Sequence, residues 1–95
     1  MEIFKVPVSK KKELDVVLSK DPIFRLSITI KDSSVISESG FLYVVVEGLE
    51  ERIVIARSEF SAISEKISEE EKSKVVAYIE KERENVYSGL GSIFG

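Results

Sequence analysis

The segment 41–46, Phe-Leu-Tyr-Val-Val-Val, constrains the fold more than any other part of the chain. It consists of aromatic, β-branched and leucine residues and is apolar at every position, a composition typical of a buried strand. Because successive side chains of a strand point to opposite faces of the sheet, both faces of this strand need cover. We therefore expect it to lie in the centre of a sheet, with a helix over one face and a second element over the other.

Three further segments predict strands around it. Residues 3–8 form a first strand, and Pro7 indicates an edge position because it has no N–H for a ladder. Residues 52–57 follow a turn at Gly48 and predict a hairpin with 41–46. Residues 22–31 alternate between an apolar face and a wet one, and the apolar face carries Phe24, Leu26, Ile28 and Ile30.

Two helices are predicted from serine caps followed by apolar residues at helical spacing. The first begins at Ser9 and runs to about Lys20, where Asp21 precedes a proline and so avoids helical geometry. The second is short and begins at Ser58. Its inward residues are Phe60, Ile63 and Ile67.

A third helix begins with a capping box, in which Ser68 is the cap and Glu71 its third helical residue. It is expected to end near Ser88, because Gly89 provides a C-terminal stop. Its apolar stripe consists of Val75, Val76, Ile79 and Val86.

These elements predict an α+β fold in the order β-α-β-(β)-β-β-α-α, where the bracketed strand is a short one at 35–36. We expect three to five mostly antiparallel strands, with two or three helices packed on one face. Residues 1–88 form a single domain, since 95 residues cannot build a second core, and 89–95 form an apolar C-terminal tail.

The composition argues against an enzyme. The chain has no cysteine and no histidine, so it lacks the thiolate nucleophile, the commonest general base and the commonest metal ligand. Its glycines do not form a phosphate-binding loop before a helix. Three glutamates at 69–71 fit a helix N-terminus, where the helix dipole favours negative charge. We expect no catalytic residues, no metal site and no cofactor.

Basic residues give a first candidate site. The chain carries 14 Lys and Arg against 17 Asp and Glu, so its net charge gives no general reason to bind nucleic acid. The one basic run begins a helix, and the wet face of 22–31 adds two cations. Together these are candidate contacts to nucleic acid or another anion: Lys10, Lys11, Lys12, Arg25 and Lys31.

The C-terminal tail gives a second candidate site. Leu90, Ile93 and Phe94 have the i, i+3, i+4 spacing of a short helical plug for a hydrophobic pocket. This spacing resembles that of the C-terminal peptides that dock on DNA sliding clamps. Those peptides usually carry Gln three residues before the first apolar anchor and end in two aromatic residues. Here Tyr87 and the pair Ile93-Phe94 occupy these positions, so the segment departs from the pattern twice.

The leading functional hypothesis is a non-enzymatic interaction or accessory domain that is homo-oligomeric and cytoplasmic. Since helices on one face leave the other face open, we expect a homodimer that covers the second face of 41–46. One alternative is a nucleic-acid accessory factor, tethered to a sliding clamp by its tail. The other is a ferredoxin-like regulator that senses a small molecule. No apolar run is long enough for a membrane span.

Overall fold

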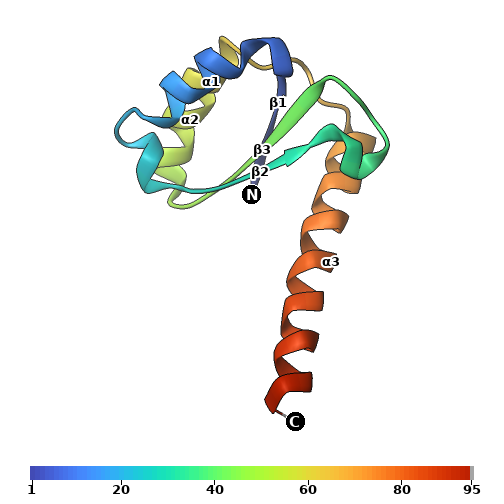
Figure 1. The fold of residues 1–95 in the computed structure, drawn as a ribbon. Helices are drawn as coiled ribbons and strands as arrows, with labels where there is room; N and C mark the ends of the chain where they lie inside the picture. The colour runs from blue at the N-terminus through green and yellow to red at the C-terminus, as the bar shows by residue number, and fades with distance from the viewer. Residues whose placement is uncertain (95) are drawn as a thin grey trace.

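The computed structural model describes residues 1–94, with side chains described as far as Asn85, and it contains a three-stranded antiparallel sheet. The strands are β1 (Glu2–Pro7), β2 (Ser27–Asp32) and β3 (Phe41–Glu47), in the spatial order β1-β3-β2 (Figure 1). β3 pairs with β1 on one side and with β2 on the other. The predicted central position of this apolar strand is therefore confirmed, as is the edge position of the strand that contains Pro7.

Helices account for most of the remaining chain, which confirms the predicted α+β class. Two of them, α1 and α2, follow β1 and β3 respectively, and α3 is the long last element. Short 3-10 turns precede α1 and flank β2. The helical bounds are α1 (Lys11–Leu18), α2 (Glu50–Ser61), α3 (Glu69–Phe94), η1 (Val8–Lys10), η2 (Ile23–Arg25) and η3 (Ser33–Ile36).

The first face of the sheet is covered by α1 and α2. Val44 and Val46 of β3 lie in a buried cluster with Leu14 of α1 and Phe60 of α2. The ring of Phe60 stacks on that of Phe4, with 4.6 Å between the ring centroids. Burial of this many aliphatic and aromatic side chains is the main source of stability in a domain of this size.

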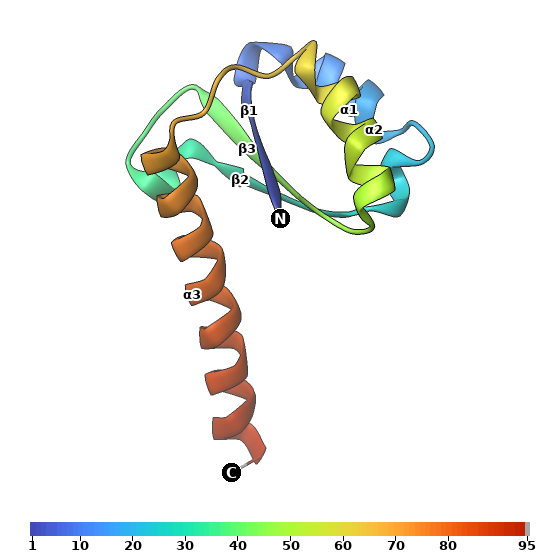
Figure 2. The same cartoon turned by 180° about the vertical axis from the view of Figure 1, so that it is seen from behind.

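The second face is covered by α3. Tyr43 and Val45 of β3 pack with Ile3 of β1 and with Val75 and Ile79 of α3. Figures 1 and 2 show α3 on the opposite side of the sheet from α1 and α2. The helices thus divide between two faces instead of sharing one. The prediction that a second copy covers this face of β3 is wrong, because α3 of the same chain covers it.

The segment 52–57 is helical, and its prediction as a strand is wrong. It lies inside α2, where Ile53, Ala56 and Phe60 are buried at helical spacing. The β-branched run at 53–55 favours a strand locally, but Val54 and Ile55 are exposed and contribute nothing to the core. Tertiary packing of three residues outweighs the local preference. The predicted cap residue Ser58 also lies within this helix.

The segment 22–31 divides into two elements where one strand was predicted. Its first part forms η2, in which Ile23 is buried and Phe24 is 56% exposed, and only its second part is strand β2. The short strand predicted at 35–36 is part of η3. Ser9 is not a helix cap either, since it lies in η1 and the N-cap residue of α1 is Lys10.

The start of α3 is confirmed in detail. The backbone N–H of Glu71 donates to the Ser68 hydroxyl oxygen at 3.1 Å, and the backbone N–H of Ser68 donates to a Glu71 carboxylate oxygen at 3.3 Å. Both bonds of a capping box are therefore formed. The predicted end near Ser88 is wrong, because the helical backbone continues through Gly89 to Phe94. Glycine lowers helix stability but does not stop a helix as proline would.

The replacement Val44→Asp tests the central position of β3. Val44 has no exposed surface, so the variant would bury an unpaired carboxylate and should lose several kcal/mol, on the order of the whole stability of a small domain. Thermal unfolding followed by circular dichroism should show no cooperative transition above room temperature. Val54→Asp is the control, because Val54 is 53% exposed on α2. A Val44→Asp melting curve equal to that of the control would contradict this account of the core.

Candidate functional site

A polar cluster joins the start of α3 to the sheet. The Lys5 Nζ atom lies 2.8 Å from Glu71 Oε2, and the Tyr43 hydroxyl donates to the same oxygen at 2.8 Å. The Lys5 ammonium also lies 4.3 Å from the centroid of the Phe41 ring. Lys5 and Tyr43 are opposite each other on β1 and β3, so the pairing register places both under Glu71.

The charges and hydrogen bonds of this cluster favour an ionised Glu71 carboxylate and a neutral Tyr43 hydroxyl. The hydrogen bond from Lys5 lowers the pKa of Glu71 to about 2, burial acts in the opposite direction, and the Tyr43 and Ser68 hydrogen bonds lower the pKa further. Burial, followed by the bond to Glu71, raises the pKa of Tyr43 above its ordinary value. An acid–base catalyst needs a pKa near the working pH. Both pKa values are shifted away from neutral pH, so the cluster is poorly suited to proton transfer. Its hydrogen bonds instead hold the start of α3 on the sheet.

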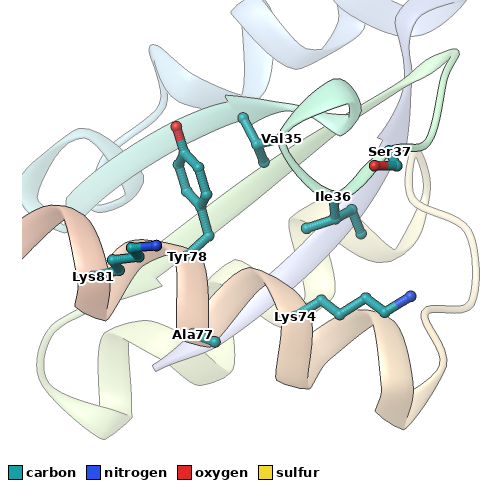
Figure 3. Close-up of a pocket in the computed structure, with 7 residues that line it drawn as sticks. All are labelled: Val35, Ile36, Ser37, Lys74, Ala77, Tyr78 and Lys81. Carbon is teal, nitrogen blue, oxygen red and sulfur yellow. The ribbon is translucent and has the colours of Figure 1, made fainter.

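An open groove runs between η3 and α3, with a volume of about 460 Å³ (Figure 3). The Tyr78 side chain rises from α3, and its ring lies beside Val35 of η3 (Figure 3). A neighbouring hollow of about 360 Å³ continues along α3 past Glu82. The lining residues of the main groove are Val35, Ile36, Ser37, Lys74, Ala77, Tyr78 and Lys81.

The groove combines an aromatic ring with positive charge. Lys74 and Lys81 come from α3 on either side of Tyr78, and Lys74 forms an exposed ion pair with Glu70 at 3.3 Å. An ammonium group beside an aromatic ring suits a ligand that is both anionic and planar. The sequence contained a signal for this site, because residues 74, 78 and 81 have the i, i+4, i+7 spacing of one helix face.

The predicted basic residues do not form one surface. Lys11 at the start of α1 pairs with Asp15 at 2.6 Å, and Arg25 in η2 pairs with Asp21 at 3.0 Å. α1 lies over the first face of the sheet. Lys31 instead lies on the α3 face, where its ammonium is 2.7 Å from Glu82 and 5.8 Å from the centroid of the Tyr78 ring.

Lys10 and Lys12 are exposed beside Lys11, at the end of η1 and the start of α1. The sheet therefore separates the basic run from Lys31, and the five residues are not brought together.

The apolar tail residues Leu90, Ile93 and Phe94 belong to the last turns of α3, and their side chains lie outside the described part of the structure. Across the residues whose side chains are described, no group of three or more Asp, Glu, His or Cys is placed to hold a metal ion. Within that same part of the chain, none of the helices combines the length and apolar character needed to cross a membrane.

The cluster predicts that stability falls in acid. The pKa of Glu71 is about 2 in the folded protein and near its ordinary 4.5 when the chain is unfolded. The ionised carboxylate therefore stabilises the fold above pH 4.5, and this contribution is lost as the pH falls from 4.5 towards 2. Glu71→Gln retains a capping side chain but removes the charge. It should cost about 1–3 kcal/mol at neutral pH, with the difference from wild type shrinking across that acidic range.

Urea unfolding at several pH values measures this effect. Glu70→Gln is the matched control, since Glu70 makes an exposed ion pair one residue earlier on the same helix and should change stability by at most about 0.5 kcal/mol. A constant difference between wild type and Glu71→Gln from pH 7 to pH 2 would contradict the role given to this charge.

Comparison of the chain with protein-family models, curated proteins and solved structures gives no match in any of the three. The case for a function therefore depends on the geometry of the chain itself.

Proposed function

We propose that the protein is a non-enzymatic interaction module that binds a partner protein through the C-terminal part of α3. The observation that carries the proposal is the length of this helix relative to the sheet. α3 contains 26 residues, and in Figures 1 and 2 the backbone of its C-terminal part extends well beyond the sheet.

The contacts of α3 follow one another from its start. Glu71 bonds to Lys5 and Tyr43, Val75 and Ile79 are buried, and two ion pairs follow within the part of the helix whose side chains are described. These join Glu82 to Lys31 and Arg83 to Glu47. Residues 84–94 then continue as helix for about 16 Å at 1.5 Å per residue. In Figures 1 and 2 this part of the ribbon stands away from the sheet and from α1 and α2.

We call residues 84–94 the arm. A helical segment of this kind is only marginally stable without a partner. Short helices in water gain too little from their own hydrogen bonds, and Gly89 and Gly91 each cost about 1 kcal/mol relative to alanine. The arm nevertheless carries Val86, Leu90 and Ile93 at the i, i+4, i+7 spacing of one helix face. Burying such side chains in the groove of another protein yields about 1.5–3 kcal/mol each, which would offset the cost of ordering the arm.

A non-enzymatic role agrees with the chemistry of the described residues. The chain lacks histidine and cysteine, and the Glu71 and Tyr43 pKa values are both shifted away from neutrality. The nucleic-acid alternative has weaker support, because the basic run of α1 and Lys31 lie on different faces of the sheet.

Sensing of a small molecule is the second candidate, and the groove at Tyr78 supports it. Two lysines and an apolar floor from Val35 and Ile36 suit an anion that carries a ring. Mononucleotides have this chemistry and serve as probes. Their binding should depend on α3 residues before Arg83, which separates this function from docking through the arm.

Replacement of Leu90 by Asp tests the arm. The charge would prevent burial of this face in a partner, so proteins captured from the native host by immobilised wild-type chain should be absent with Leu90→Asp. Since the backbone of this part of α3 stands away from the sheet in Figures 1 and 2, the melting temperature should change by no more than about 2 °C. Affinity capture with quantitative mass spectrometry, together with thermal unfolding, measures both effects.

Ser92→Asp is the control for the added charge, because Ser92 is polar and lies in the same segment. It should capture the wild-type set of proteins, and amide exchange in residues 86–94 should slow when one purified member of that set is added. Equal capture by all three chains, or a large loss of stability in Leu90→Asp, would contradict docking through the arm.

Thermal shift tests the groove. Millimolar mononucleotide should raise the melting temperature of wild type, and Lys81→Gln should reduce that rise because it removes one of the two cations. Lys66→Gln is the control, since Lys66 is exposed in the segment between α2 and α3. The absence of any rise with wild type would exclude this candidate.

A further inference from the structure

The two edges of the sheet differ in how they are protected. At the β1 edge, the backbone N–H of Glu65 donates to the Lys5 carbonyl at 2.7 Å, and Pro7 removes one donor. At the other edge, β2 pairs with β3 alone, and the backbone hydrogen bonds of the described turns and loops include none from residues 27–32. An unpaired strand edge is a template for pairing with another strand. β2 contains no proline and its register with β3 is continuous, so its charged residues Lys31 and Asp32 are the features that oppose pairing.

The side chains of β2 also suit pairing. Ile28 packs against the core from its rim, whereas Ile30 is 38% exposed and lies outside the core cluster. Both are on the face covered by α1 and α2, because they are opposite Val46 and Val44 of β3. An isoleucine exposed at an open sheet edge gains stability when a further strand covers it.

We propose that β2 pairs antiparallel with β2 of a second copy of this chain, which joins two three-stranded sheets into one of six strands. A two-fold axis perpendicular to the sheet relates residues of the same face, so the axis must pass beside a single residue. With the axis at Thr29, this residue is opposite its own copy. Ile28 is then opposite Ile30, and Ser27 is opposite Lys31.

This register is the best match that the sequence of β2 allows. It places apolar residues opposite apolar residues on one face and leaves no pair of like charges in direct opposition. With the axis at Thr29, Asp32 is opposite Leu26, which precedes the strand. Moving the axis to Ile30 would instead place Asp32 opposite Ile28, which sets a charge against an aliphatic side chain within both strands. Moving it to Ile28 would draw Leu26 and Arg25 into the pairing, although both precede the strand.

The pairing places both copies of α3 on the same face of the joined sheet, because the two-fold axis does not exchange the faces. This interface rests on β2 alone and is independent of the proposed docking through the end of α3. The two proposals can therefore be tested separately. Loss of the arm should leave the β2 pairing intact, and disruption of β2 should leave partner binding by a single arm intact.

A single cysteine tests the register directly, since the chain has none of its own. Opposite residues of an antiparallel pair have Cα atoms about 4.5–5.5 Å apart, within disulfide range. Thr29→Cys should therefore form a covalent dimer under mild oxidation. Ser27→Cys is the matched control on the same strand face, because its two copies would be four residues apart along the strand, about 13 Å, and beyond reach. A dimer of Ser27→Cys or Ile30→Cys in place of Thr29→Cys would overturn the register.

The assembly is measured without cross-linking by sedimentation of the full chain. Wild type should approach twice the single-chain mass of 10.7 kDa between about 10 and about 500 µM, the range for a weak interface. Ile30→Lys should keep the single-chain mass over at least a tenfold wider range of concentration, because it places charge against Ile28 of the partner. Val54→Lys, at an exposed aliphatic site on α2, should behave as wild type. A single-chain mass for wild type at every concentration would overturn the proposal.

Discussion

Four consecutive residues of β3, Tyr43 to Val46, have no exposed surface, and they alternate between the two faces of a sheet that is one layer thick. Such a strand is stable in water only when both faces are covered at once. The three α-helices meet this requirement. α1 and α2 cover Val44 and Val46, while α3 covers Tyr43 and Val45. The helices are therefore on two faces because the strand is apolar on two faces.

Covering the second face creates a problem that the polar cluster solves. Tyr43 is fully buried, yet its hydroxyl needs a hydrogen-bond partner. Glu71 supplies one, and the carboxylate is in turn stabilised by Lys5 and by the backbone of the helix that it caps. One side chain thus satisfies the buried phenol and the orphan donor at the helix start. The first turn of α3 is located over the sheet by this carboxylate, and the apolar residues that follow are aligned with the core.

The parts of the fold that followed from the sequence are those with an unambiguous local signal. The doubly apolar strand, the capping box at Ser68 and the edge strand with Pro7 each depend on one physical rule, and each is found as expected. The segment 52–57 could not be assigned this way, because its β-branched residues favour a strand while its buried positions are set by contacts with distant elements.

Of the candidate sites, one wall of the groove at Tyr78 could be predicted from the sequence, because Lys74, Tyr78 and Lys81 have the spacing of one helix face. Its other wall comes from η3, which is adjacent only after folding. The cluster of Lys5, Tyr43 and Glu71 joins three elements far apart in the chain, and no spacing in the sequence reveals it.

The strand order also governs how the sheet can assemble. β1 and β2 are separated in space by β3, the last of the three to leave the ribosome, so the first two strands have no partner until the third has been made. β2 and β3 are near neighbours in sequence and can pair early, whereas β1 must wait for a loop of nearly forty residues to close between Lys5 and Tyr43. Because the outer strands never touch each other, removal of the middle one leaves no partial sheet. The domain is thus committed to folding as a whole, and a nascent chain that stops before residue 41 has no native sheet to protect it.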